Sequence, residues 1–251
     1  APSAWPPPPP PRRLERYHFG PLGPSAGRTG PFIEAFAVFL LIFVALPFGL
    51  RYAFNPAEFG IFTRLGIMFG ALGLGLLWPR FRGVPWAEWR RGFGWTAPRG
   101  VFRELAAGLV GYLAGLPLLA LATLVMFVLN KVSGAEPSHP INDEFGTGGT
   151  LGVVLIYAAA AVWAPVVEET FFRGALFHRL RGGWNWLVSA AVSSFAFAAV
   201  HPQGWTVIPV LMAIAVVFCT LREWRGSSLP GMAGHALHNG LLVTMMVIGG
   251  T

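Results

Sequence analysis

Three short clusters of ionisable and amide side chains interrupt otherwise apolar stretches, and they are the residues of this chain that could do chemistry. The first cluster is EETFFR at residues 168–173, the second is FAAVH at 197–201, and the third is HALHN at 235–239. Ionisable groups within an apolar span are costly to bury in lipid, so each cluster is by default a hypothesis about function. Their chemistry depends on which of these side chains can face a common cavity.

The first cluster carries two adjacent carboxylates with different expected roles. Successive residues on a helix point about 100° apart, so Glu168 and Glu169 face different directions. Glu169 precedes Arg173 by four residues, which is the favourable order for an ion pair along a helix, and we interpret these two as a structural pair. Glu168 then has no local partner and can face a cavity. The alternative is that all three charges lie at a membrane–water interface.

The interpretation of the second cluster depends on a predicted hairpin. A lone His201 at the end of an apolar stretch is more simply a histidine at the membrane surface. The stretches that carry Glu168 and His201 are expected to be antiparallel around Gly183, which lies 15 residues after the first and 18 before the second. At about 1.5 Å of rise per residue their depths differ by about 5 Å, so the two side chains can meet. Phe197, one turn before His201, can pack against the imidazole ring.

The third cluster places His235 and Asn239 on one face of a helix, with His238 at the border of that face. Two histidines and an amide in the middle of an apolar span are poorly explained as core packing. Glu168 with His201 could hold and deprotonate a water molecule. His235 with Asn239 could donate hydrogen bonds to a developing oxyanion. Together these residues predict the hydrolysis of a peptide bond by an activated water.

The elements that must position these residues are apolar segments long enough, or nearly so, to cross a bilayer, which takes about 20 residues. Hydrophobic residues make up 54% of the chain and charged residues 12%, about half the charged share of a soluble protein. The segments are 33–52, 59–78, 105–129, 151–171, 186–200, 205–221 and 229–248. The chain is therefore predicted to be an all-α, polytopic transmembrane helical bundle with about seven spans.

The distribution of arginine predicts the orientation of this bundle. The first 30 residues and every second connection between the segments are rich in arginine, whereas the alternate connections carry few positive charges. Because positive residues favour the cytoplasmic side, we expect the N-terminus to be cytoplasmic. We expect an integral protein of a bacterial or archaeal inner membrane. The net charge of +7 comes without a basic stripe or a stacking motif, so no nucleic acid partner is expected.

The chain divides into two regions of different composition. Residues 1–30 contain an unbroken proline run at 6–11, which adopts polyproline II and cannot join a helix. We interpret them as a proline-rich cytoplasmic tail, which is either a semi-rigid spacer or a docking segment for a protein partner. Residues 31–251 form the transmembrane domain, with a motif-bearing core at 150–250. Residues 84–99, with three tryptophans among arginines, are either an interfacial element or a plain basic loop.

The three clusters, in this order on successive apolar helices, resemble the motifs of the CAAX prenyl protease and bacteriocin-processing family, also called CPBP or Abi. That family carries E-E-x-x-x-R, then F-x-x-x-H, then H-x-x-x-N or a close variant. The matching positions of this chain are Glu168, Glu169, Arg173, Phe197, His201, His235 and Asn239. The resemblance covers residues 152–248. The proline-rich tail is outside the family pattern, and Pro202 prevents the helix from continuing normally past His201.

The resemblance implies an intramembrane endopeptidase whose catalytic cavity opens toward the cytoplasm and whose substrate is a membrane-associated peptide, prenylated in some cases. It implies Glu168 and His201 as the water-activating pair. It implies His235 and Asn239 as the groups that stabilise the oxyanion. Three further residues would support the site: Glu169, Arg173 and Phe197.

The sequence leaves alternatives open for the cofactor and for the function of the protein. Family members are described both as zinc metalloproteases and as metal-independent glutamate proteases. Glu168, His201 and His235 could form a three-ligand zinc site with an open position for water. The absence of an H-E-x-x-H helix favours a metal-free site. Two other functions are a protease-like accessory or structural subunit of a larger membrane complex, which the tail favours, and a proton or ion transporter. The lack of matched broken helices counts against a transporter.

Overall fold

The computed structural model describes residues 29–45, 61–135 and 149–249, with only the backbone described at 61–68. Within these ranges the chain forms helices and turns without a β-strand. The helical elements are, in chain order, α1 (Thr29–Leu40), η2 (Leu41–Ala45), α3 (Ile61–Phe81), α4 (Trp86–Phe93), α5 (Val101–Ser133), α6 (Gly149–Tyr157), η5 (Ala158–Trp163), α7 (Ala164–Glu168), η6 (Glu169–Phe177), α8 (His178–Leu180), α9 (Trp186–Ala199), η7 (Trp205–Val207), α10 (Ile208–Arg225) and α11 (Leu229–Gly249). The proline-rich tail predicted at 1–30 lies outside the described residues, apart from the two residues that begin α1.

Length and composition confirm an all-α membrane bundle. Four helices of the described chain are long and apolar enough to cross a membrane, and two further apolar helices, Thr29–Ala45 and Trp186–Ala199, are shorter. The four are Val101–Ser133, Gly149–Leu180, Trp205–Arg225 and Leu229–Gly249. The count of about seven spans stays a prediction, because parts of the segments expected at 33–52 and 59–78 lie outside the described residues.

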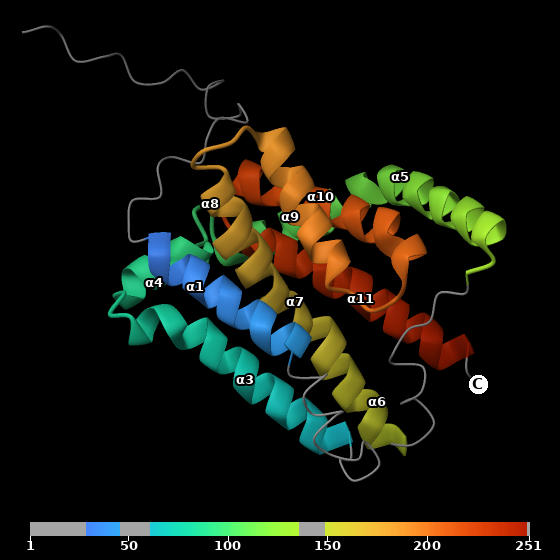
Figure 1. Cartoon of the computed structure of the whole chain (residues 1–251), viewed down its shortest axis with the longest axis horizontal. Helices are drawn as coiled ribbons and strands as arrows, with labels where there is room; N and C mark the ends of the chain where they lie inside the picture. The colour runs from blue at the N-terminus through green and yellow to red at the C-terminus, as the bar shows by residue number, and fades with distance from the viewer. Residues whose placement is uncertain (1–28, 46–60, 136–148, 250–251) are drawn as a thin grey trace, which may run out of the picture.

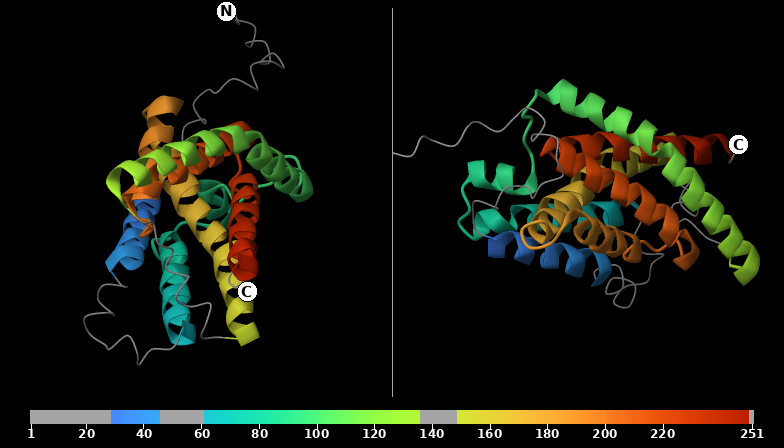
Figure 2. Two further views of the ribbon diagram at one scale, coloured as in Figure 1. Left: turned by 90° about the vertical axis from the view of Figure 1, so that its right-hand side faces the viewer. Right: turned by 90° about the horizontal axis from the view of Figure 1, so that it is seen from above.

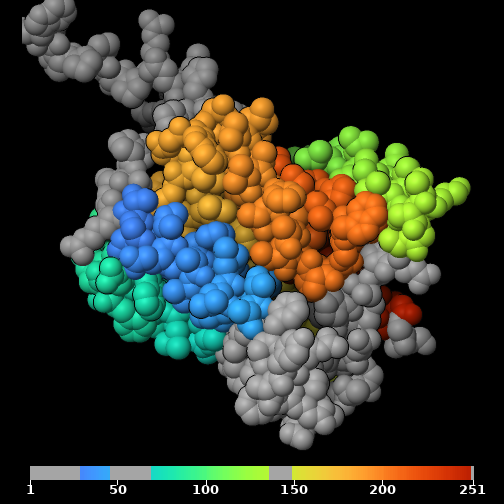
Figure 3. Space-filling model, viewed as in Figure 1, coloured from blue at the N-terminus to red at the C-terminus, as the bar shows by residue number. Residues whose placement is uncertain are grey.

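One long helix crosses the middle of the molecule (Figure 1). It runs from α6 through η5, α7 and η6 to α8, with α1 and α3 on one side and α11 on the other. α11 packs against both α5 and the middle helix, and α10 lies between α5 and α9; Figure 2 shows α5 crossing the outside of this group. In the space-filling view, side chains of α1 and α9 lie next to those of the middle helix (Figure 3).

The outer face of α5 is apolar and uncovered. A soluble protein does not leave so large a contiguous apolar surface in water, whereas lipid tails solvate it without cost. The large apolar side chains that α5 exposes include Val110, Leu113, Leu121, Leu124, Phe127, Val128 and Val132. This face is therefore expected to contact acyl chains.

Two ion pairs hold the end of α10. Arg225 binds Glu104, at the start of α5, through two contacts of 2.8 and 3.0 Å. Arg181 binds Glu223 in the same two-pronged way, at 3.0 and 2.8 Å, from the turn before α9. Paired contacts of this kind fix orientation as well as distance. Sequence reasoning counted Arg181 and Arg225 only as loop charges. In the structure they fix how α5, α9 and α10 meet.

The tryptophan-rich stretch at 84–99 contains a short helix, α4, that packs on the middle helix. A Cβ at Gly174 would lie 2.4 Å from the carbonyl oxygen of Phe93, so only glycine allows η6 to come this close to α4. After α4, Trp95 Nε1 donates to Thr170 Oγ1 at 2.8 Å. This region therefore supports the helix that carries the carboxylates, and its place in the headgroup plane stays a prediction.

Candidate active site

The carboxylate cluster lies inside the protein and not at a helix end. The segment expected to end at residue 171 continues to Leu180, through nine residues of π-helix, Glu169–Phe177. Glu169 and Arg173 have no exposed surface, and Glu168 is 7% exposed. These charges are therefore enclosed by the protein, and their depth relative to the membrane surface stays a prediction. π-Helical turns are rare and are frequently found at functional sites.

The structure brings Glu168, His201 and His235 together from three separate elements. The Oε2 atom of Glu168, at the end of α7, lies 3.8 Å from Nε2 of His201, just after α9. The same oxygen lies 3.8 Å from Nε2 of His235 in α11. These spacings exceed a direct hydrogen bond, and Glu168 Oε2 is buried with no hydrogen-bond partner. One carboxylate oxygen thus faces two ring nitrogens, each near enough to share a small polar group with it.

The hydrogen bonds of the far ring nitrogens determine what the near ones can do. His201 Nδ1 lies 2.6 Å from the carbonyl oxygen of Phe197, one turn earlier. Since a carbonyl only accepts, this nitrogen must carry the proton. His235 Nδ1 lies 3.2 Å from Glu169 Oε1, so it too donates, to a carboxylate. When its ring is neutral, each histidine therefore presents an unprotonated Nε2 to Glu168, and when its ring is charged, that Nε2 can donate.

Aromatic rings hold both histidines in place. Phe197 contacts His201 with ring centroids 4.4 Å apart, and its other neighbours are His235 at 6.0 Å and the guanidinium of Arg173 at 4.7 Å. Phe218 of α10 stacks on His235 at 5.1 Å. Sequence reasoning expected Phe197 beside His201 and missed Phe218, because its position depends on how α10 packs on α11.

Glu169 and Arg173 form an ion pair in the protein interior. Arg173 Nη1 lies 3.0 Å from Glu169 Oε1, and Nη2 donates to the carbonyl oxygen of Ala215 at 3.2 Å. The oxygen that binds Arg173 is also the one that accepts from His235 Nδ1. The pair predicted from the spacing of four is therefore present, and it reaches the candidate catalytic residues through His235.

Gly231 was not expected to matter, yet it allows α11 to approach Glu169. A Cβ at this position would lie 2.5 Å from Glu169 Oε2 and 3.2 Å from Cδ. Gly231 is one turn before His235, on the same face of α11. A small residue one turn before a functional histidine was the available signal, but the helix-to-helix register that makes it important is not visible in sequence.

Replacing Gly231 by Ala is expected to destabilise the protein by about 1–3 kcal/mol, because the added methyl group overlaps a buried carboxylate that cannot move away without leaving Arg173. The measurement is thermal unfolding in detergent. Gly240→Ala on the same helix is the control, since its Cβ would meet only the Ala161 methyl group at 3.8 Å. Equal melting temperatures for the two variants would show that the approach of α11 to Glu169 is not tight.

Asn239 makes a different contact from the one expected. Its Nδ2 donates to the backbone carbonyl oxygen of Ala160, in η5, at 2.8 Å. Among the described residues no hydrogen bond joins Asn239 to Glu168, His201 or His235, so its role at an oxyanion stays a prediction. The neighbouring His238 contacts the Tyr112 hydroxyl through Nδ1 at 3.1 Å.

A metal ion needs several donor side chains that converge on one point. Across the described part of the chain, no group of three or more His, Cys, Asp or Glu side chains is arranged to hold a metal ion. The alternative of a zinc site at Glu168, His201 and His235 stays a prediction.

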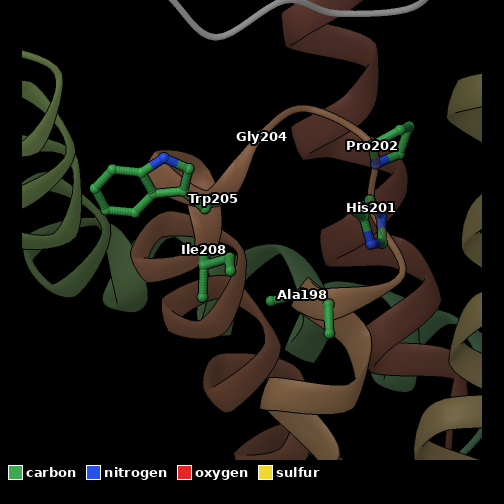
Figure 4. Close-up of a pocket in the computed structure, with 7 residues that line it drawn as sticks. Ala198, His201, Pro202, Gly204, Trp205 and Ile208 are labelled. Carbon is green, nitrogen blue, oxygen red and sulfur yellow. The ribbon is translucent and has the colours of Figure 1, made fainter. Parts of the chain in front are cut away.

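A cavity of about 320 Å³ adjoins His201 (Figure 4). Its walls come from the end of α9, the following turn, and the start of α10. The lining residues are Ala198, Ala199, His201, Pro202, Gly204, Trp205 and Ile208. Apart from the imidazole and the exposed backbone of the turn, the lining side chains are apolar, and the hollow is open on one side. It has room for an apolar group next to the histidine.

Comparison with known proteins finds a family match over the motif-bearing part of the chain. Residues 150–241 match the model of the family described as type II CAAX prenyl endopeptidase Rce1-like. This segment is therefore similar to the Rce1-like family. It contains the four candidate catalytic residues, and the resemblance drawn from the three motifs is confirmed. By its description, the family that this segment resembles consists of CAAX prenyl endopeptidases.

One curated relative resembles the chain over a similar length. It is an uncharacterized 24.3 kDa protein of Escherichia coli, 31% identical over 112 residues, which are 43% of this chain. The chain spans about half the length of that relative (50%). No solved structure matches the chain.

Proposed function

We propose that this protein is an intramembrane endopeptidase that hydrolyses a peptide bond of a membrane-associated substrate with a water activated by Glu168 and His201. The observation that carries the proposal is the position of one Glu168 oxygen, 3.8 Å from the near nitrogens of both histidines. A carboxylate and an unprotonated imidazole nitrogen are both bases of the kind used in general acid–base catalysis. The Rce1-like match supports the same class of reaction.

Glu168 would act first as a base and then as an acid. A water held between Glu168 Oε2 and His201 Nε2 loses a proton to the carboxylate as its oxygen bonds to the scissile carbonyl carbon. The tetrahedral intermediate then collapses, the carbon–nitrogen bond breaks, and Glu168 returns the proton to the leaving amine. The products are a new carboxyl group and a new amino group, and Glu168 ends as it began.

His235 would stabilise the oxyanion as an imidazolium. Since its Nδ1 donates to Glu169, Nε2 can donate only when the ring is charged. Ionised Glu168, Glu169 and Arg173 together carry one net negative charge, which a charged His235 cancels. Buried charges are tolerated when they are paired in this way. The oxyanion would then face a donor whose orientation is fixed from behind by Glu169.

A membrane-bound peptide with an apolar side chain beside the scissile bond fits the cavity next to His201. We therefore propose a prenylated or otherwise lipid-anchored peptide as the first substrate class to test. The anchor would keep the peptide in the bilayer, and the cavity would hold one apolar side chain. The inner membrane of a bacterium or archaeon, with the N-terminus inside, remains the proposed location.

Filling the cavity is expected to weaken substrate binding more than it slows the chemical step. Replacing Ala199 by Phe should raise KM by about tenfold for a peptide with a large apolar residue at the cut site, because about one to two kcal/mol of apolar contact is lost. Ala191→Phe, at an exposed position of α9 outside the cavity, is the control. Identical KM values for the two variants would show that the substrate does not enter this cavity.

The proposal is tested by reconstitution of the purified protein in liposomes with farnesylated and unmodified CAAX peptides and with other lipid-anchored peptides, and mass spectrometry of the products. We expect one new carboxyl end per cleavage and a preference for anchored peptides. No cleavage of any anchored peptide would count against a protease and leave a role as an accessory subunit, with the tail as a docking segment, as the alternative.

The same liposomes test the zinc alternative. Zinc measured at one ion per protein, lost together with activity on chelation and restored with it on adding zinc, would reassign Glu168, His201 and His235 as metal ligands. We expect the purified protein to cleave at the same rate before and after chelation.

A further inference from the structure

A proline breaks the hydrogen-bond ladder just before Glu168. Through η5 the backbone makes π-helical bonds, in which each N–H donates to the carbonyl five residues earlier. One bond of this ladder runs from the N–H of Ala164 to the carbonyl oxygen of Ala159. The next acceptor is the carbonyl oxygen of Ala160, and the residue five positions later is Pro165. Proline has no N–H, so the ladder cannot supply this bond.

The side chain of Asn239 supplies the missing donor. Its Nδ2 lies 2.8 Å from the Ala160 carbonyl oxygen. Pro165 is buried, so water does not replace its missing N–H easily. Ala160 is half-buried, and a carbonyl left without a donor away from water is costly, so proteins pair nearly all such groups. An amide from α11 therefore completes a bond that the middle helix cannot make alone.

We propose that Asn239 is a positioning residue, which replaces the absent N–H of Pro165 and so fixes the register between α7 and α11. This inference rests on the proposed function. Along α11, Asn239 lies one turn beyond His235, and along the antiparallel middle helix Ala160 lies before Glu168. Two contacts therefore join the same pair of helices. One is the bond between Asn239 and Ala160, and the other is the approach of His235 to Glu168. Loss of the bond between Asn239 and Ala160 therefore shifts His235 relative to Glu168.

This role differs from that of an oxyanion donor, and the difference can be measured. If Asn239 acts by completing the ladder, a residue with an N–H at position 165 can substitute for it. If the amide acts on the reacting atoms, nothing at position 165 can replace it, because the backbone there is directed at Ala160.

The experiment compares four proteins in liposomes: wild type, Asn239→Ala, Pro165→Ala and the double variant. We expect Asn239→Ala to lower kcat by about 10- to 100-fold with little change in KM, as for a catalytic group displaced by a fraction of an ångström. Pro165→Ala should cleave close to the wild-type rate, and the double variant should recover most of the loss. A double variant as slow as Asn239→Ala would overturn the proposal.

Thermal unfolding of the same four proteins gives a second readout that does not depend on proteolysis. Asn239→Ala should lower the melting temperature and the double variant should restore it. If no variant, wild type included, cleaves any peptide while this restoration is seen, the proposed function fails and the bond assignment stands. If the double variant does not recover the melting temperature, the assignment of the bond between Asn239 and Ala160 is wrong, even if the enzyme is active. Pro165→Val supplies the same N–H and replaces Pro165→Ala should the latter fail to fold.

Discussion

Replacing Glu168 by Gln is expected to lower kcat for peptide cleavage by about 10²–10⁴-fold, the usual contribution of a positioned acid–base group. Glutamine keeps the size and polarity of the side chain but cannot take a proton from water. KM should change little, because the substrate is bound mainly through its anchor and the cavity beside His201. The measurement is single-turnover cleavage in liposomes under saturating protein.

The control for this variant is Glu34→Gln, which removes a carboxylate that binds Trp78 and Arg82 between α1 and α3, outside the candidate site. It should cleave at nearly the wild-type rate. Cleavage by Glu168→Gln at the rate of this control would show that another group activates the water.

Replacing Arg173 by Met is expected to destabilise the protein by about 3–5 kcal/mol, the cost of leaving one member of a buried ion pair without its partner. Arg173 is fully buried, pairs with Glu169, and lies over the rings of Phe197 and Phe218 at 4.7 and 5.3 Å. Methionine fills much of the volume and keeps the contacts with the rings. The measurement is the free energy of unfolding in a denaturant series in mixed micelles.

The double variant Glu169→Gln with Arg173→Met separates loss of charge pairing from loss of packing. Removing both charges should recover most of the stability, because no buried charge is left uncompensated. It should not recover activity, since His235 Nδ1 then faces a neutral amide in place of a carboxylate. A double variant as unstable as Arg173→Met would mean that packing, and not the ion pair, makes Arg173 important.

Sequence reasoning predicted the contacts that depend on one helix or one hairpin. The spacing of four between Glu169 and Arg173 was enough to predict their pair, because local helix geometry determines which side chains are neighbours. The depth comparison around Gly183 predicted that Glu168 and His201 lie close together. The boundaries expected for the segments at 186–200 and 229–248 agree with α9 and α11 to within one residue.

The remaining features depend on tertiary packing or on rare backbone geometry. The middle helix was expected to end at residue 171, because two carboxylates and an arginine are typical of a span's end. It continues to Leu180, and residues of α9, α10 and α11 contact those charges. The approach of Gly231 to Glu169 depends on how α11 is placed along the middle helix, which no periodicity reports. The contact of Asn239 with Ala160 depends on a π-helical turn. Pro165 was the one local feature of the sequence that could indicate such a turn.

An experimental structure of the protein in lipid nanodiscs would test the central claim most directly, through the distances from the Glu168 carboxylate to the two imidazoles. The account predicts that Nε2 of His201 and Nε2 of His235 both lie near one Glu168 oxygen, at a spacing of about 4 Å that a single water can bridge. A Glu168 side chain that faces lipid or bulk water, remote from both rings, would contradict it.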